Sequence, residues 1–169
     1  GFRTFFINDP LFRSNKTGLE DPILCYGRSG KEGYVERTDV RSHSDWIDLW
    51  KVYVPESNNI GTELNDDNQN AFVGSPKSIC TETFLVIGAD LSLNEVSANN
   101  LCAYLKTKFA RFLLSLAKIS QHGTAKTYCF VPVQDFSRAW TDADLYEKYG
   151  LNVFLTKKTG STNKDLKDL

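Results

Sequence analysis

The chain of 169 residues contains no methionine, not even at position 1, and no apolar run long enough to cross a bilayer. The missing initiator indicates a piece of a longer polypeptide. The first residues also lack the basic, apolar and small segments of a secretion signal. We therefore expect a soluble, cytoplasmic protein without a membrane segment, long enough for one domain with its own core.

Close pairs of metal-ligating residues are missing as well. The cysteines are scattered along the chain, at Cys25, Cys80, Cys102 and Cys129. His43 and His122, the only histidines, are poorly placed to complete a zinc site with them. We interpret the cysteines as reduced thiols, because disulfides would require an exported protein, and we predict no metal site.

Signatures of common enzyme classes do not occur either. A nucleotide-binding P-loop needs a longer spacing before its Gly-Lys pair than Gly27 and Gly30 provide, and there is no serine elbow. The string that comes nearest to a nuclease site, Asp165-Leu166-Lys167, lies in a polar tail without a rigid strand to position it. The sequence therefore predicts no catalytic residue in this chain.

Local patterns predict several strands and one long helix. Residues rich in β-branched and aromatic side chains predict strands over 1–7, 22–26, 34–37, 51–54, 79–87 and 127–133. Ser92 and Glu95 form a capping box for a helix that is expected to run to about Ser120. Ser44 is expected to cap a short helix that follows it.

A second capped helix is predicted near the end of the chain. Thr141 and Asp144 form its capping box, Trp140 and Leu145 are spaced as a hydrophobic staple, and Gly150 is a natural stop. The elements together predict an α+β domain, with a mostly antiparallel, twisted sheet packed on one long helix and two or three shorter helices. We expect residues 1–151 to form this domain, residues 152–169 to be a polar and partly disordered tail, and residues 56–70 to be a mobile loop.

Positive charge is concentrated in one part of a chain whose net charge is −1. Between Val96 and Gln134 there is no acidic residue, yet this stretch contains Lys106, Lys108, Arg111, Lys118 and Lys126. On the predicted long helix, Lys108, Arg111 and Lys118 project together beside an apolar stripe. Such a helix could lie along a DNA backbone, or could simply have a solvated basic face.

A second basic feature is the glycine-rich segment between two predicted strands. Gly27, Gly30 and Gly33 permit turns with positive φ, and Arg28, Ser29 and Lys31 lie between them. An arginine at a hairpin tip suits a DNA groove, because its guanidinium bonds both acceptors of guanine. A plain surface hairpin remains the alternative.

Four segments resemble a known family in the expected order: Gly1–Phe6, Ser78–Gly88, Tyr104–Leu116 and Thr127–Leu151. They resemble the C-terminal target-recognition domain of bacterial restriction–modification adenine-N6 DNA methyltransferases, of the TaqI-like specificity domain family. The resemblance ends at about residue 151 and implies a module that reads double-stranded DNA. It also implies a preceding methyltransferase domain on the same polypeptide, with S-adenosylmethionine as its cofactor, and in some members a fused or paired restriction endonuclease.

The catalytic motifs of the resembled enzymes are not in this chain. Their Asn/Asp-Pro-Pro-aromatic motif has no match, since Asn8-Asp9-Pro10 lacks the second proline and the aromatic residue, and no cofactor is expected in this fragment. We predict that the hairpin residues Arg28, Ser29 and Lys31 read bases. The predicted contacts to the DNA backbone are Lys106, Lys108, Arg111, Lys118 and Lys126. A protein–protein interaction module is the alternative, and a small enzyme with its own pocket is a third possibility.

Overall fold

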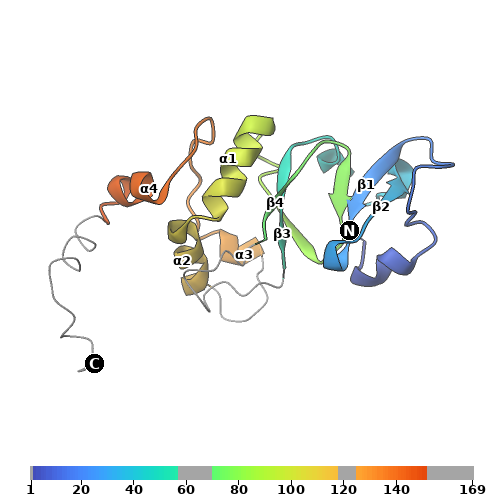
Figure 1. Ribbon diagram of the computed structural model, residues 1–169, viewed down its shortest axis with the longest axis horizontal. Helices are drawn as coiled ribbons and strands as arrows, with labels where there is room; N and C mark the ends of the chain where they lie inside the picture. Colours follow the sequence, from blue (N-terminus) through green and yellow to red (C-terminus); the bar gives the residue numbers. More distant parts are fainter. Residues whose placement is uncertain (1, 57–69, 118–124, 152–169) are drawn as a thin grey trace, which may run out of the picture.

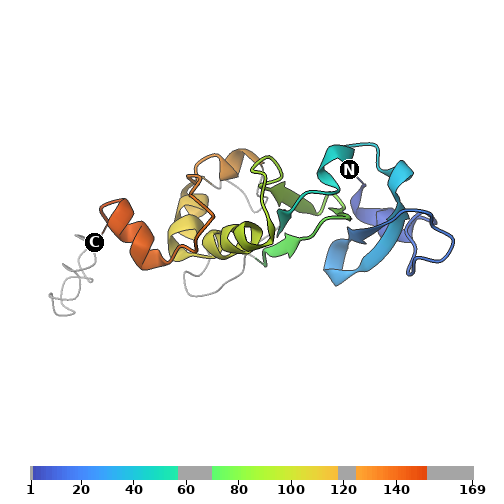
Figure 2. The ribbon, with the colours of Figure 1, turned by 90° about the horizontal axis from the view of Figure 1, so that it is seen from above.

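The computed structural model describes residues 2–56, 70–117 and 125–151 and contains two three-stranded sheets. Figure 1 shows an elongated arrangement, with the hairpin of β1 and β2 towards one end, the sheet of β3 and β4 in the middle, and the helices at the other end. The view from above in Figure 2 gives the same order. We call the two sheets the N-terminal sheet and the central sheet.

The N-terminal sheet has the strand order β2-β1-β5. Strand β1 (Pro22–Tyr26) pairs antiparallel with β2 (Glu32–Glu36) and parallel with β5 (Ser78–Cys80). Short 3₁₀ helices surround it, at Thr4–Asn8, Arg28–Gly30, Arg37–Asp39 and Ser44–Trp46. Its core consists of Ile23, Cys25 and Val35 with Phe6 and Ile47.

The central sheet has the order β4-β3-β6, and both of its pairings are antiparallel. Strand β3 (Lys51–Pro55) lies between β4 (Phe72–Gly74) and β6 (Phe84–Ile87). Val52 and Val54 pack into a core that is shared with the helices, whereas Tyr53 points to the N-terminal sheet and bonds Ser78 there. The alternation of side chains along β3 therefore gives the sheet two different buried faces.

The helices cover one face of the central sheet. Helix α1 (Glu95–Leu105) contacts β3 and β4, and α2 (Lys108–Ala117) contacts α3 (Ala125–Tyr128) and α4 (Asp142–Lys148). Helices and mainly antiparallel strands are thus combined as predicted, and the α+β class is confirmed. In the described part of the chain, no helix is both long and apolar enough to span a membrane.

The prediction of one continuous helix from Ser92 to Ser120 is wrong. Asn94 caps α1, with Ser97 completing the capping box, while Ser92 has a positive φ of 50°. The helix stops at Leu105, and α2 starts afresh three residues later at Lys108. Two groups cap this new start: the carboxylate of Asp142, distant in sequence, accepts the backbone N–H groups of Lys108 and Phe109 at 3.2 and 2.9 Å, and the Thr107 hydroxyl accepts that of Ala110 at 3.2 Å.

Three predicted strands also differ from the structure. Residues 4–8 form a 3₁₀ helix, and only Phe2 makes a β-bridge, to Thr81. The segment 79–87 is divided between β5 and β6, which belong to different sheets, so the turn leaves Glu82 exposed where a continuous strand would have buried it. In 127–133 the chain ends helix α3 and continues without a strand.

Elements with strong local signals are confirmed. The hairpin of β1 and β2 and strand β3 form where the sequence predicts them. A short 3₁₀ helix is present at Ser44–Trp46, but the prediction that Ser44 caps it is wrong, because Ser44 is its first residue and His43 is the N-cap, without a side-chain bond. Thr141 and Asp144 make the expected capping box, and Gly150 follows α4 with a φ of +67°. The loop after Glu56 and the tail after residue 151 lie outside the described residues.

Candidate functional site

The tip of the β1–β2 hairpin presents the predicted reading residues to solvent. The backbone closes with a bond from Gly27 N–H to the Lys31 carbonyl at 2.7 Å. Ser29 and Gly30 both adopt left-handed backbone angles, with φ of 59° and 71°. Arg28, Ser29 and Lys31 are all exposed, so the tip is a short basic projection.

The base of this tip packs against the 3₁₀ helix that precedes the N-terminal sheet. A side chain at Gly27 would meet Ile7 at 2.4 Å, whereas one at Gly30 would meet nothing. Neither Arg28 nor Lys31 makes an ion pair within residues 2–56, 70–117 and 125–151. A tip with an anchored base and unneutralised cations at its end is suited to contact a polyanion.

The second basic group is only partly available as predicted. Lys108 is exposed and Lys106 is half-buried at the break between α1 and α2. The Asp142 carboxylate already occupies the N-terminus of α2, where a phosphate would otherwise bind the free N–H groups. These lysines therefore lie beside a built-in negative charge.

Arg111 does not project to solvent, contrary to the prediction. It is only 8 % exposed, on the side of α2 that also buries Phe109, Ala110 and Leu114. Because the helix is interrupted before Lys108, the exposed basic face that was predicted for one continuous helix is not present on α2. Lys118 lies outside the described residues, and so does the side chain of Lys126.

The hairpin and α2 do not form one continuous basic surface. The central sheet stands between them in both views (Figures 1 and 2). Among the described residues, these cations therefore do not gather on a single face. The described basic groups are an exposed hairpin tip on the N-terminal sheet and, at the start of α2, two lysines that lie beside the Asp142 carboxylate.

A cation–π cluster near the end of the described chain was missed by the sequence analysis. The guanidinium of Arg138 lies 3.6 Å from the ring centre of Trp140, and Nζ of Lys148 lies 4.5 Å from it. Lys148 also donates to Gln134 at 2.7 Å. These contacts fasten α4 to the body, so the two cations stabilise the fold and are less available to a ligand.

A cavity of about 570 Å³ lies where the central sheet faces the N-terminal sheet. Its lining includes Trp46, Lys51, Tyr53, Cys80 and Phe84, together with the segment 39–43. Burial raises the pKa of the Cys80 thiol to about 12, so this cysteine is a poor nucleophile at neutral pH.

Lys51 is a buried cation in the wall of this cavity and is only 2 % exposed. Its Nζ donates to the backbone carbonyls of Trp46, Ile47 and Leu49, at 2.8, 3.1 and 2.9 Å. Loss of solvation lowers the pKa of the ammonium from its ordinary 10.5 to about 8. Sequence reasoning missed this buried lysine, because a lysine in a predicted strand is usually solvated.

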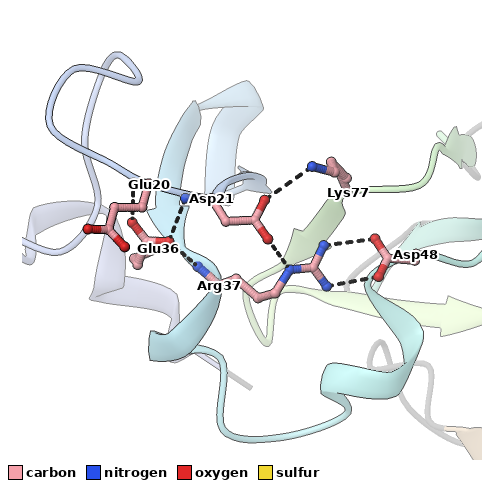
Figure 3. A network of polar contacts seen from close by, with 6 residues as sticks. All are labelled: Glu20, Asp21, Glu36, Arg37, Asp48 and Lys77. Carbon is pink, nitrogen blue, oxygen red and sulfur yellow. Dashed lines mark hydrogen bonds and ion pairs between the residues drawn. The ribbon is translucent and has the colours of Figure 1, made fainter.

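An ion-pair network on the surface braces the turn that supplies these carbonyls (Figure 3). Arg37 bonds both oxygens of Asp48, at 2.8 and 2.9 Å, and one oxygen of Asp21 at 2.5 Å. Lys77 reaches the other Asp21 oxygen at 3.1 Å, and these bonds hold the pKa of both aspartates below its usual value. Asp48 lies between Ile47 and Leu49, so the network and the Lys51 contacts fix the same turn from two sides.

Comparisons with family models, with curated proteins and with solved structures give no significant match to this chain. The assignment of a function therefore depends on the chemistry of the surface and of the cavity.

Proposed function

We propose that this chain is a double-stranded DNA recognition module, and that the hairpin tip is the element that enters a groove. The observation that supports this most is the exposed, left-handed turn that carries Arg28, Ser29 and Lys31 without an ion pair among the described residues. An arginine can bond guanine in bidentate fashion, a serine can bond several base edges, and a lysine can neutralise a phosphate. The three side chains thus provide both readout and anchoring.

In this proposal the module belongs to a restriction–modification adenine-N6 DNA methyltransferase, as the sequence resemblance implies. The methyltransferase domain on the same polypeptide would bind S-adenosylmethionine and hold the duplex from the other side, and a restriction endonuclease would be fused or paired. Lys106 and Lys108 would contact the DNA backbone at a second point. Arg111 is withdrawn from the DNA contacts, because its burial gives it a structural role.

The test measures the salt dependence of duplex binding by fluorescence anisotropy. In the double variant Arg28→Ala/Lys31→Ala, we expect weaker binding and a log–log salt slope that is smaller by about 1 to 2, because up to two phosphate contacts are lost. If Arg28 reads a guanine, the variant also loses roughly 1–3 kcal/mol of discrimination on a library of duplexes. Affinity of the isolated chain is expected to be modest, since the other half of the clamp is on another domain.

A charge-matched control distinguishes contacts made by the hairpin tip from a general effect of the net charge. Arg3→Ala/Lys16→Ala removes the same charge from exposed positions near the N-terminal sheet and should retain the wild-type salt slope. Lys106→Ala/Lys108→Ala then tests the second contact point. Equal losses in all three double variants would show that only net charge matters, and an unchanged slope in the tip variant would refute the proposal.

A protein partner is the alternative function, and one observation favours it. Apolar side chains on α2 and on the segment after α3 are exposed: Phe112 by 50 %, Leu116 by 69 %, Phe130 by 67 % and Val133 by 68 %. Exposed apolar groups on neighbouring elements are typical of interaction surfaces. If Phe112→Ser/Leu116→Ser abolishes complex formation with a partner while the chain shows no DNA binding at low salt, this alternative replaces the first.

A further inference from the structure

Strand β6 is an outer strand of the central sheet and consists only of apolar residues, Phe84-Leu85-Val86-Ile87. All of them are half-buried rather than enclosed. Proteins commonly protect an outer strand with charged residues, a proline or a bulge, because its free backbone groups can pair with another chain. Strand β6 contains neither a charged residue nor a proline. Its sequence therefore leaves this edge open to pairing.

The edges of the N-terminal sheet differ, because other segments of the chain bond to them. Arg13 exchanges two backbone hydrogen bonds with Tyr34 of β2, at 2.9 and 2.7 Å. On the opposite side, just beyond the end of β5, the Glu82 N–H donates to the Phe2 carbonyl at 2.7 Å. Among the described residues, no segment pairs in this way with the outer side of β6.

The ladder between β3 and β6 shows which backbone groups of β6 face outwards. The Glu56 N–H donates to the Thr83 carbonyl at 2.9 Å, so the residues at this end of the ladder form a hydrogen-bonded pair. Hydrogen-bonded and non-hydrogen-bonded pairs alternate along an antiparallel ladder. Leu85 and Ile87 therefore bond β3, and the other two residues of β6 direct their N–H and C=O groups away from it.

Val86 provides the open donor and acceptor at this edge. The N–H of Phe84 also faces outwards, but it donates to the Thr81 carbonyl at 3.1 Å. Within the part of the chain that the structure describes, neither the N–H nor the C=O of Val86 has a hydrogen-bond partner. A half-buried backbone that lacks partners is stabilised when another backbone supplies them.

The cavity between the two sheets lies beside this edge. Phe84 and Val86 line it, whereas no residue of β4, the other outer strand of the central sheet, does. Side chains alternate along a strand, and Val86 lies opposite Tyr53, so Phe84 and Val86 share the face of the sheet that carries Tyr53. Further apolar residues that line the cavity and are at least partly exposed are Leu11, Val40 and Ile79.

The charges that line the cavity balance. Two carboxylates, Asp39 and Glu82, and two cations, Arg41 and Lys51, are among its lining residues. No sign of charge is therefore favoured in a ligand. The apolar side chains beside the open edge select for apolar groups.

Turns close the edge at both ends, and this determines what can bind there. Thr81 occupies the N–H of Phe84 at one end, and at the other the Gly88 carbonyl accepts the Leu91 N–H at 3.1 Å. A second copy of β6 would bring an edge with equally few open groups. An extended peptide instead offers a donor and an acceptor at every second residue along one side, so it can match Val86 wherever its side chains fit.

We propose that the outer edge of β6 binds an extended segment of another protein, which adds a strand to the central sheet. The backbone of this segment bonds the N–H and C=O of Val86, and its apolar side chains at alternate positions enter the cavity beside Phe84 and Val86. The four residues of β6 span about 13 Å, which suits a segment of roughly four or five residues. In strand addition, backbone bonds provide affinity and the side-chain pockets provide specificity. This inference does not depend on DNA binding by the hairpin tip.

A library of random peptides displayed on phage provides the probe. Peptides are selected on the wild-type chain, and we expect the selected sequences to alternate apolar and polar residues. The tightest binder is then synthesised with a fluorescent label. Val86→Pro removes the outward N–H but no bond to β3, and an outer strand tolerates proline at such a position. This variant should bind the labelled peptide about three- to tenfold more weakly than the wild type.

Matched controls separate backbone pairing from general apolar contact. Val73→Pro changes the middle of β4, where the same alternation directs the backbone groups outwards, and should retain the wild-type affinity. Phe112→Ser/Leu116→Ser removes the exposed apolar patch on α2 and should retain it too. The selected peptide is also synthesised with methyl groups on alternate backbone nitrogens, in both registers. One register should abolish binding to the wild type, and this result decides the question if Val86→Pro does not fold.

Amide hydrogen exchange, measured by NMR, locates the contact. In the free chain we expect the Val86 amide to exchange faster than those of Leu85 and Ile87, and the bound peptide should slow it by about tenfold or more. The proposal is overturned if no peptide is selected, if backbone methylation in either register leaves binding intact, or if the exchange of Val86 does not change. Self-association of the wild type that Val86→Pro abolishes would also overturn it, because the occupant of the edge would then be a second copy.

Discussion

The burial of Lys51 has a direct consequence for the pH dependence of stability. Its pKa is about 8 in the folded chain and returns towards 10.5 when unfolding exposes it to water. Between these values the unfolded chain binds more protons than the folded one, so the free energy of unfolding rises with pH. The full shift corresponds to roughly 3 kcal/mol, of which about 2 kcal/mol should appear between pH 7 and 9.5.

Lys51→Met isolates this contribution, because methionine fills similar space without a titratable group. Other groups also titrate in the alkaline range: burial raises the pKa of Cys25 and Tyr104, each to about 12, and such groups lower stability as the pH rises. They are present in both proteins and largely cancel in the difference. Urea denaturation of wild type and variant at several values from pH 7 to 9.5 gives the difference at each pH.

The sign of the change is the decisive result. We expect the stability of the wild type relative to Lys51→Met to increase by about 2 kcal/mol across this range. The constant part of the difference, which contains the lost hydrogen bonds to the three carbonyls, does not enter the comparison. Parallel curves would mean that the ammonium is solvated, and a difference that falls with pH would mean that it has an anionic partner.

Three further outcomes test the fold. Arg37→Met should lower Tm most above about pH 5. The difference in Tm from the wild type should shrink in acid, because Asp48, whose lowered pKa depends on this arginine, becomes protonated. A difference in Tm that persists in acid would contradict the ion-pair network. Leu145→Ala should cost about 2–5 kcal/mol in urea denaturation, since this leucine of α4 is fully buried, and a loss below 1 kcal/mol would show that α4 is not docked. Gly74→Ala should cost roughly 1–3 kcal/mol, because its new methyl group would meet the Tyr53 ring at 2.3 Å, and a neutral result would mean that the ring can move.

Elements whose causes are local were predictable from the sequence. The capping box of α4 involves only Thr141 and Asp144, three residues apart, and the hairpin turn contains Gly30, which adopts a φ of 71°. In both cases the residues that determine the conformation are inside the window that a pattern covers.

Elements whose causes are distant were not predictable. The start of α2 is capped partly from a distance, because Asp142, more than thirty residues later, accepts its first two N–H groups, while the neighbouring Thr107 hydroxyl accepts that of Ala110. The segment 79–87 has a strand pattern throughout, but its two halves pair with β1 and β3 in different sheets. The cage around Lys51 likewise exists only once the turn at 46–49 folds back over the start of β3.

The same distant contacts decide which cations remain for a ligand. Counting lysines and arginines along the sequence treats them as equivalent, but Arg37 is neutralised by two aspartates, and Lys51 and Arg111 are buried. Among the described residues, Arg28 and Lys31 remain at the hairpin tip as a compact exposed pair. If the proposal holds, DNA affinity depends chiefly on this tip and on the second contact at Lys106 and Lys108. A strong, tip-independent affinity would therefore contradict both the charge distribution and the proposal built on it.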